Sequence, residues 1–371
     1  MQIPFLDLKP QISQLKENIL KRVEEVFEHG RFINGPEVTE FEEKLKEYTG
    51  APFALACGNG TEALQLALMA LGIGPDDEVI VPNFTFFATS ESVNLVGATP
   101  VFVDIQLADY NLDTSALDEA YSSKTKAIIP VSLFGQVPEM DAINTWAKEK
   151  SITVIEDGAQ SFGAEYKGKK SCNLSTLATT SFFPAKPLGT FGDGGAIFTQ
   201  SEELYSKMRS IREHGQGARY CHTQIGLNAR LDSLQCGFLI DKLKGHQWAI
   251  ERRNSIASKY TENFEKLESK GLFPPKVASH KLSAWAQYTL RFSERDKLIQ
   301  HLSDKGIPTA IHYPFPLSEQ PVYKENTASS RLSSSENSQK ASKEVFSIPI
   351  YPDTPEEHVN FIIESVKRFF D

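Results

Sequence analysis

Short β-branched segments alternate with amphipathic segments from about residue 50 to residue 200, and this alternation constrains the fold more than any other feature of the chain. It is typical of a mostly parallel α/β sheet with helices on both faces. Ligands of such sheets bind beyond the carboxyl ends of the strands. The strands that we predict are 53–57, 78–81, 99–104, 127–131, 153–157, 180–183 and 196–199. The helices that we predict between them include 61–71, 88–96 and 140–150.

The C-terminal third has a different pattern. A long helical stretch over 231–266 leads into it, and a predicted strand at 284–292 and a predicted helix at 294–305 follow. Serine and other polar residues dominate 324–342, which we predict to be a mobile surface loop. Because 371 residues exceed what one small core needs, we expect two domains. We place a large domain at 1–245 and a smaller α+β domain at 246–371.

Composition restricts the partners and the compartment. The net charge of −9 argues against a general nucleic-acid binder, which needs a basic face. Cys57, Cys172, Cys221 and Cys236 have no CxxC pairing and no metal-site spacing, so we expect reduced thiols and no metal. We find no secretory signal and no run of about 18 apolar residues. These features predict a soluble, cytoplasmic protein without a membrane partner.

Lys186 lies between Pro184 and Pro187, in the connection from one predicted strand to a glycine-rich loop at 189–195. The prolines keep this backbone out of a helix. A lysine held rigidly in such a place is poorly solvated, and desolvation lowers its pKa, which activates the amine for Schiff-base chemistry. The alternative is an exposed lysine on a hairpin loop, which is the commoner state of lysine. The segments described next favour the reactive amine.

The run 57–61 follows a strand, opens a helix and contains Gly58 and Gly60. Glycines let the backbone approach a ligand, and the free N–H groups of a first helical turn favour a phosphate. A nicotinamide dinucleotide would also need an acidic residue at the end of the next strand, whereas here the acids at 76–78 precede or open that strand. We therefore predict a phosphate site, with a simple structural turn as the alternative.

Asp157 ends the predicted strand 153–157. A carboxylate there can pair with a protonated ring nitrogen, the pairing that makes pyridoxal phosphate an electron sink. The alternative is that Asp157 caps a following helix. Phe86 follows strand 78–81 and would stack on a planar cofactor, with ordinary core packing as its alternative.

A locally basic stretch interrupts the acidic chain and would suit an anionic substrate, although a solvated helix face is its commoner explanation. Its members are Arg209, Arg212, His214, Arg219, His222 and Arg230. His312 and Tyr313 lie in a proline-rich turn that suggests a substrate loop.

Four segments together resemble the sugar-nucleotide aminotransferases of the DegT/StrS family. They are Gly-Pro-Glu-Val at 35–38, Asn-Gly-Thr-Glu-Ala-Leu at 59–64, Glu-Asp-Gly-Ala-Gln-Ser-Phe-Gly-Ala at 156–164 and Ser-Phe-Phe-Pro-Ala-Lys at 181–186. The resemblance covers nearly the whole chain. It implies the fold type I architecture of pyridoxal-phosphate enzymes, similar to that of aspartate aminotransferase.

The resemblance also implies roles for residues that face the cofactor. Lys186 would form the Schiff base with pyridoxal 5′-phosphate and shuttle the proton between the cofactor and substrate carbons. Asp157 would hold the pyridinium proton, Gln160 would contact the phenolic oxygen of the ring, and Phe86 would stack on the ring.

The remaining cofactor contacts that the resemblance implies concern the phosphate. Gly60, Thr61 and Ser181 would bind it, and Asn228 would reach it from the other subunit of a homodimer. The active site would then lie at the dimer interface.

Three further runs, 161–164, 171–176 and 309–314, are most similar to the aminotransferases that make UDP-2,3-diacetamido sugar uronic acids. Arg230, His312 and Tyr313 match positions that contact the sugar nucleotide in those enzymes, and Arg230 would suit a uronate carboxylate. The implied reaction moves an amino group from L-glutamate to the 3-keto group of UDP-2-acetamido-2-deoxy-3-oxo-D-glucuronate. The product would serve the synthesis of surface polysaccharide such as O-antigen.

Two alternatives stay open. A dTDP-3-keto-6-deoxyhexose aminotransferase uses much the same residues, and only the sugar pocket separates it from the uronate enzyme. A non-catalytic sensor or binding protein on this fold is disfavoured by the intact Lys186 and Asp157.

Gly158, where the family more often has alanine, removes no chemical group. Some relatives act as dehydratases with histidine in place of the lysine, so Lys186 favours transamination.

Overall fold

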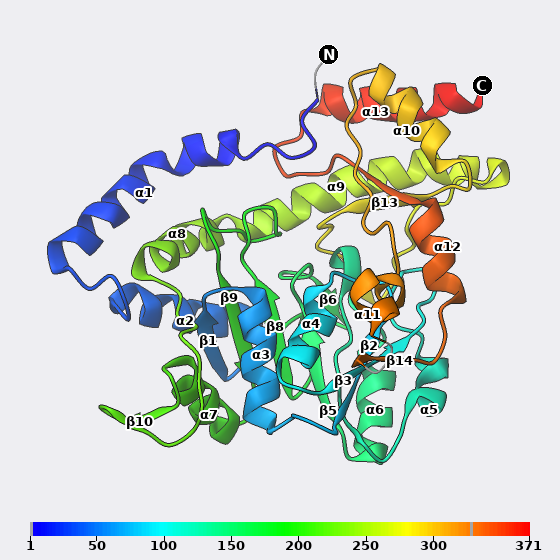
Figure 1. Ribbon diagram of the computed structural model, residues 1–371. Helices are drawn as coiled ribbons and strands as arrows, with labels where there is room; N and C mark the ends of the chain where they lie inside the picture. Colours follow the sequence, from blue (N-terminus) through cyan, green and yellow to red (C-terminus); the bar gives the residue numbers. More distant parts are fainter. Residues whose placement is uncertain (1–2, 327–328) are drawn as a thin grey trace.

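The computed structural model describes residues 3–326 and 329–371, and its largest unit is an eight-stranded sheet (Figure 1). In order across the sheet, the strands are β1 (Phe53–Cys57), β9 (Gly195–Thr199), β8 (Leu177–Ser181), β5 (Thr153–Asp157), β4 (Thr125–Ile128), β2 (Glu78–Pro82), β3 (Thr99–Val103) and β14 (Arg331–Leu332). β9 runs antiparallel to β1 and β8, and the other neighbouring strands are parallel. The mostly parallel α/β sheet predicted from the sequence is therefore confirmed.

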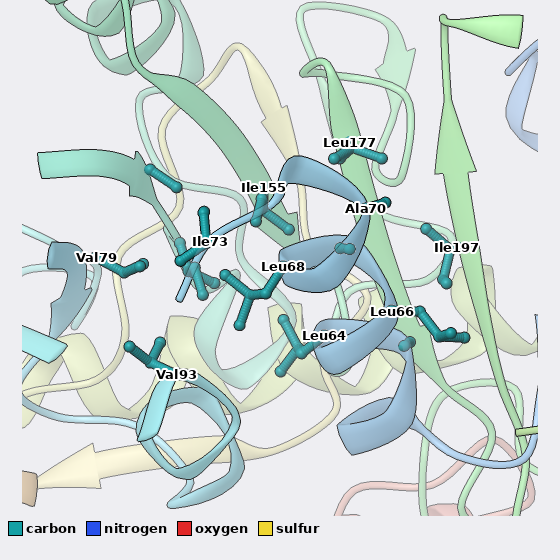
Figure 2. Packing of buried hydrophobic residues seen from close by; sticks show 14 of the residues in the cluster. Leu64, Leu66, Leu68, Ala70, Ile73, Val79, Val93, Ile155, Leu177 and Ile197 are labelled. Carbon is teal, nitrogen blue, oxygen red and sulfur yellow. The ribbon is translucent and has the colours of Figure 1, made fainter. Parts of the chain in front are cut away.

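α3 (Gly60–Leu71) covers one face of this sheet with its apolar side. Its Leu64 and Leu68 lie over the strands, beside Ile155, Leu177 and Ile197 (Figure 2). These five side chains are at most 2% exposed, and burying one leucine stabilises the fold by about 1.5–3 kcal/mol. Three more helices pack on this face: α4 (Ala88–Leu95), α7 (Glu202–Arg212) and α11 (Pro321–Glu325).

Helices also cover the opposite face of the sheet. This face is apolar as well, because successive residues of a strand point to opposite sides of the sheet and both sets are apolar here. In β2, Val79 and Val81 belong to the cluster of α3, whereas Ile80 packs in a second cluster with Ile143 of α6 (Met140–Lys150). α2 (Pro36–Thr49), α5 (Leu117–Ala120) and α8 (Ser233–Lys244) complete this layer. The predicted helices 61–71, 88–96 and 140–150 are confirmed as α3, α4 and α6.

The carboxyl ends of β1, β2, β5 and β8 meet at one edge of the sheet because these four strands point the same way. β8 and β9 form a hairpin, and β8 covers 177–181 rather than the predicted 180–183. Ser181 is the last residue of β8 to pair with β9, opposite Gly195. The chain then turns at Pro184, so the connection that carries Lys186 begins earlier than the apolar pattern indicates.

A second core lies in the C-terminal third, around the antiparallel pair of β13 (Tyr288–Arg291) and β15 (Val345–Ile348). It is enclosed by α9 (His246–Phe264), α10 (Arg295–Asp304) and α13 (Glu356–Phe370), with α10 and α13 side by side near the C-terminus (Figure 1). The helix predicted over 231–266 is wrong as a single element, because α8 and α9 are separate. Gly245, a poor helix former, lies between them. The division at residue 245 stays a prediction.

The prediction of a mobile loop over 324–342 is wrong for the described residues. The chain returns to the sheet after Leu317 and Ser318, where β14 pairs with β3 and α12 (Glu336–Glu344) follows. We call residues 317–326 and 329–344 the C-terminal return. Its first anchor is Asn83 at the end of β2, whose backbone carbonyl accepts from Leu317 N at 2.7 Å and whose side chain accepts from Ser318 N at 2.9 Å.

Asp104, at the end of β3, is the second anchor of the C-terminal return. Its carboxylate accepts hydrogen bonds from Asn337 N and Ser338 N, both at 2.7 Å, and from Ser338 Oγ at 2.5 Å. The acid therefore caps the first turn of α12, where backbone N–H groups have no partner within the helix. The polar composition that suggested a solvated loop instead satisfies this buried carboxylate.

The remaining elements lie at the periphery. They are α1 (Lys9–His29), β6 (Glu165–Tyr166), β7 (Lys169–Lys170), β10 (Gln216–Ala218), β11 (Cys221–His222) and β12 (Lys281–Leu282). Across residues 3–326 and 329–371, no helix is both long and apolar enough to cross a membrane. The same residues hold no group of three or more His, Cys, Asp or Glu side chains placed to bind a metal ion.

Candidate active site

A cavity of about 700 Å³ opens at the carboxyl edge of the sheet and brings together most of the residues singled out in the sequence. The predicted residues that line it are Gly60, Thr61, Phe86, Asp157, Gln160, Ser181, Lys186, His312 and Tyr313. They come from segments that follow β1, β2, β5 and β8 and from the loop that precedes the C-terminal return. Asn228 and Arg230 do not line the cavity of this chain.

The loop that carries Lys186 is held tightly by its own backbone. Lys186 N donates to Phe183 O at 2.9 Å, and Thr190 N donates to Phe182 O at 2.7 Å. Gly189 packs so closely that a Cβ there would lie 2.6 Å from Phe183 O. These contacts fix the position from which the lysine side chain reaches the cavity.

The surroundings of Lys186 make its amine reactive. Burial lowers the pKa of Lys186, and the negative charge of Asp157 partly opposes that shift. In a larger fraction of the protein molecules, Lys186 is therefore the neutral amine, which is the form that attacks a carbonyl carbon. The alternative of a fully exposed lysine on a hairpin loop is wrong, because Lys186 is half-buried in the cavity wall.

Asp157 is 5% exposed at the end of β5. Thr89 Oγ1 donates to its Oδ2 at 3.0 Å, and Ala159 N donates to its Oδ1 at 3.1 Å. Burial raises the pKa of Asp157, while these two donors and the charge of Lys186 lower it. Residues 158–164 form turns and not a helix, so the helix-capping alternative is wrong. The carboxylate is held as an acceptor that faces the cavity.

The first turn of α3 forms an anion-binding end of the cavity. Asn59 caps the helix by accepting from Glu62 N at 2.8 Å, and helical geometry leaves the N–H groups of Gly60 and Thr61 without helical partners. A Cβ on Gly60 would lie 2.9 Å from Cβ of Ser181, so only glycine fits there without a shift. Free N–H groups and the positive end of the helix suit a phosphate.

Two aromatic rings and one amide form the adjoining wall. Gln160 Oε1 accepts from Phe134 N at 2.7 Å, and Gln160 Nε2 donates to the hydroxyl of Tyr313 at 3.1 Å. Burial raises the pKa of Tyr313, so the phenol stays protonated. Phe86 is 55% exposed, with its ring 6.1 Å from that of Tyr313. A ring this exposed at a cavity is free to stack on a planar ligand, so the core-packing alternative for Phe86 is wrong.

The predicted basic stretch does not act as one group. Arg212 is buried, forms an ion pair with Glu42 at 2.9 Å and donates to the carbonyl of Ala56 at 2.8 Å, which makes it structural. Arg230 Nε donates to Asn228 Oδ1 at 2.9 Å, on the surface and outside the cavity. Arg230 and Asn228 are therefore held together outside the cavity of their own chain.

Thr89 and Gln287 are two of the cavity-lining residues that escaped prediction from the sequence. Thr89 holds the carboxylate of Asp157 from α4, and its only local signal is its position just after the aromatic run 84–87. Gln287 lines the cavity from the residue before β13, within a segment read only as a strand. Neither residue belongs to a recognisable motif.

The arrangement fits pyridoxal phosphate. The cavity offers a reactive amine, a buried carboxylate for a ring nitrogen, an exposed aromatic face and an anion-binding helix end. With this sheet order, these features define the fold type I class of pyridoxal-phosphate enzymes.

The chain belongs to the DegT/DnrJ/EryC1/StrS aminotransferase family, whose sequence pattern matches residues 13–367. A UDP-2-acetamido-2-deoxy-3-oxo-D-glucuronate aminotransferase of Pseudomonas aeruginosa is 48% identical over 350 residues, which are 94% of this chain and 95% of that protein.

Solved structures agree with this assignment. The crystal structure of a DegT/DnrJ/EryC1/StrS aminotransferase from Brucella abortus has a TM-score of 0.95 and 38% identity, with 99% of each chain covered. NtdA of Bacillus subtilis, solved with bound cofactor PMP, has a TM-score of 0.91 and 29% identity over 99% of this chain and 85% of that one. The predicted fold type I aminotransferase is therefore confirmed in fold and in enzyme class.

Proposed function

We propose that this aminotransferase uses pyridoxal phosphate to move an amino group from L-glutamate to the 3-keto group of UDP-2-acetamido-2-deoxy-3-oxo-D-glucuronate. The observation that carries the proposal is the meeting of the Lys186 amine, the Asp157 carboxylate and the free first turn of α3 in one cavity. The choice of sugar rests on the 48% identical relative from Pseudomonas aeruginosa, whose name specifies that substrate.

The cavity residues would hold the cofactor at five points. Lys186 would bind it covalently, Asp157 would pair with its ring nitrogen, and Phe86 would stack on its ring. Gly60 N–H and Thr61 N–H, together with the hydroxyl of Ser181, would bind its phosphate. Gln160, already hydrogen-bonded to Tyr313, would present its amide to the phenolic oxygen. When bound, the cofactor supplies an electron sink that stabilises negative charge on the substrate carbon.

The side chains of this protein would then move protons. Once the amino group of the substrate has displaced it from the cofactor, Nζ of Lys186, neutral in part because burial lowers its pKa, would carry the proton between the substrate carbon and the cofactor carbon. His312 faces the same space, and burial lowers its pKa as well, so its ring is neutral at pH 7. Nδ1 of His312 lies 3.1 Å from Ser347 Oγ, which leaves Nε2 for a polar group of the sugar.

We infer that the enzyme is a homodimer whose active sites lie at the interface. Asn228 and Arg230 do not line the cavity of their own chain, and Asn228 is exposed while Arg230 is partly exposed. Large apolar side chains are exposed in the last turn of α1 and near β11, where Phe27 is 64% and Ile225 is 85% exposed. Such surfaces mark protein interfaces. In the dimer, Asn228 would complete the phosphate site of the partner, and Arg230 would pair with the uronate carboxylate.

We place this enzyme in the cytoplasm, where nucleotide sugars are made. Its product would be a nucleotide-activated diamino sugar, which glycosyltransferases would consume in assembling a surface polysaccharide such as O-antigen. The charge and composition that argue against nucleic acid support this reading.

The test is amination of the keto sugar, generated in situ by oxidation of the matching nucleotide sugar, with L-glutamate as donor and mass spectrometry as readout. We expect Lys186→Ala to lose turnover by several orders of magnitude and to lose the visible absorbance of the lysine-bound cofactor. Lys167→Ala, at an exposed surface lysine, is the matched control. Full turnover by the Lys186 variant would refute the mechanism. Equal amination of a dTDP-3-keto-6-deoxyhexose would refute the choice of sugar.

A further inference from the structure

Gln287 brings to the cavity an amide whose hydrogen bonds are incomplete. Its side chain lines the cavity, and its Oε1 is buried without a hydrogen-bond partner among the described residues. A buried acceptor left unpaired costs about 1–3 kcal/mol, so such groups are rare. Oε1 lies beneath the cavity surface, so a ligand in the cavity reaches it only when the amide turns. An amide that rotates about its last bond exchanges donor for acceptor, so Gln287 can serve either kind of ligand group.

Gln287 lies on the wall that carries His312. It directly precedes β13, in which Tyr288 points into the second core. Because side chains alternate along an extended segment, Gln287 shares the opposite face with Thr289. Thr289 Oγ1 lies 3.0 Å from Ser347 Oγ, which in turn lies 3.1 Å from Nδ1 of His312. Thr289 and Ser347 are buried behind the cavity surface and connect β13 to His312. The C-terminal third therefore supplies one polar wall made of Gln287 and His312.

The other walls of the cavity already have roles in the proposed function. Asp157 and Phe86 would take the cofactor ring, and the first turn of α3 would take its phosphate. The wall of Gln287 and His312 borders the space that remains for substrate. A neutral amide matches hydroxyl and acetamido groups, which both donate and accept, whereas the carboxylates of glutamate favour charged donors.

We propose that Gln287 is a substrate-contacting residue that hydrogen-bonds a hydroxyl or acetamido group of the keto sugar and helps to select the sugar over the amino donor. This inference rests on the proposed function, because it names a contact for the same substrate. Gln287 would act only in the second half-reaction, in which the keto sugar is aminated.

Gln287→Met keeps the length of the side chain and removes the amide. Loss of one hydrogen bond predicts a rise of about tenfold in the KM for the keto sugar nucleotide. The half-reaction with glutamate, followed by the change in cofactor absorbance in single-turnover mixing, should keep its wild-type rate. Gln300→Met is the matched control, since Gln300 is exposed on α10 and bonds Asp304. It should leave both half-reactions unchanged.

Gln287→Glu is the second variant, because it keeps the shape of the side chain if the methionine disturbs folding. A carboxylate in this position should also impair the sugar step selectively, and more for a uronate than for an uncharged keto sugar. Wild-type sugar kinetics in either folded variant would overturn the inference and leave the proposed function standing. Equal loss of both half-reactions, or loss of the cofactor spectrum in both variants, would make Gln287 structural and overturn it too. A wild-type enzyme that aminates no keto sugar would refute both proposals.

Discussion

We expect His246 to lower the free energy of unfolding of the wild type by about 2 kcal/mol as the pH falls from 7 to 5. His246→Gln should not show this part of the decrease. His246 begins α9, is 2% exposed and packs against the rings of Tyr48 and Phe162, which stack on each other. Its Nε2 donates to Phe162 O at 3.0 Å. Burial lowers the pKa of His246 from 6.5 to about 3, and the charges of Arg253 and Lys170 add to that shift.

The protein loses stability as the pH falls because the folded and unfolded chains bind protons at His246 differently. Below pH 6.5 the unfolded chain protonates this histidine, whereas the folded chain keeps it neutral down to about pH 3. The stability that depends on a neutral His246 is therefore present above pH 6.5 and is lost as the pH falls. The loss approaches about 1.4 kcal/mol for each pH unit, which gives about 2 kcal/mol between pH 7 and pH 5.

The measurement is urea unfolding at the two pH values, followed by circular dichroism, for the wild type and His246→Gln. Glutamine keeps a donor near the position of Nε2 but does not titrate. His222→Gln, on the exposed strand β11, is the control and should keep the wild-type pH dependence. If His246→Gln loses as much stability as the wild type between pH 7 and pH 5, the argument from burial fails.

Three other substitutions test the site and its supports. Thr89→Val removes a donor to Asp157 and so raises the pKa of that carboxyl further. We expect pyridoxal phosphate to bind about tenfold more weakly. The loss of affinity should be greater at pH 6 than at pH 8, because more of the carboxyl is protonated at the lower pH. Asp104→Asn removes the anionic cap of α12, which should cost about 1–2 kcal/mol in urea unfolding and accelerate hydrogen exchange in that helix. Gly60→Ala forces a methyl group to 2.9 Å from Cβ of Ser181, so cofactor binding measured by titration should weaken by about tenfold or more.

Each of these substitutions has a matched control. Thr199→Val removes a buried hydroxyl that donates to a carbonyl away from the cavity and should keep wild-type cofactor affinity. Asp296→Asn changes an exposed acid in the first turn of α10 and should leave the exchange of α12 unchanged. Gly245→Ala adds a Cβ whose nearest neighbour is 4.0 Å away and should bind the cofactor normally. A control that behaves like its test variant would contradict the corresponding argument.

Local patterns in the sequence predict the sheet and the centre of the site well. β1 and β5 begin and end at the predicted residues, since each is a short apolar run with polar residues after it. Asp157 ends β5 and Lys186 lies shortly after β8, and parallel strands bring such positions to a common edge. The meeting of these two residues therefore follows from the order of strands and helices.

The errors arise where distant residues decide the structure. The serine-rich segment after 324 has the composition of a solvated loop, yet Asp104, more than 230 residues earlier, accepts its hydrogen bonds. Thr89 and Gln287 gain their roles from contacts across the fold, for which no periodic pattern exists. Asn228 points to a limit of another kind, because its proposed target lies on a second copy of the chain.

The C-terminal return also determines how the cavity can change shape. Its anchors at Asn83 and Asp104 lie on the large sheet, and His312 and Tyr313 lie directly before the first anchor. A rotation of the C-terminal third away from the sheet would break the pairing of β14 with β3 and uncap α12. The polar wall is thus preorganised, so ligands lose little affinity to ordering it. Substitutions that loosen the C-terminal return should weaken substrate binding without touching any substrate atom.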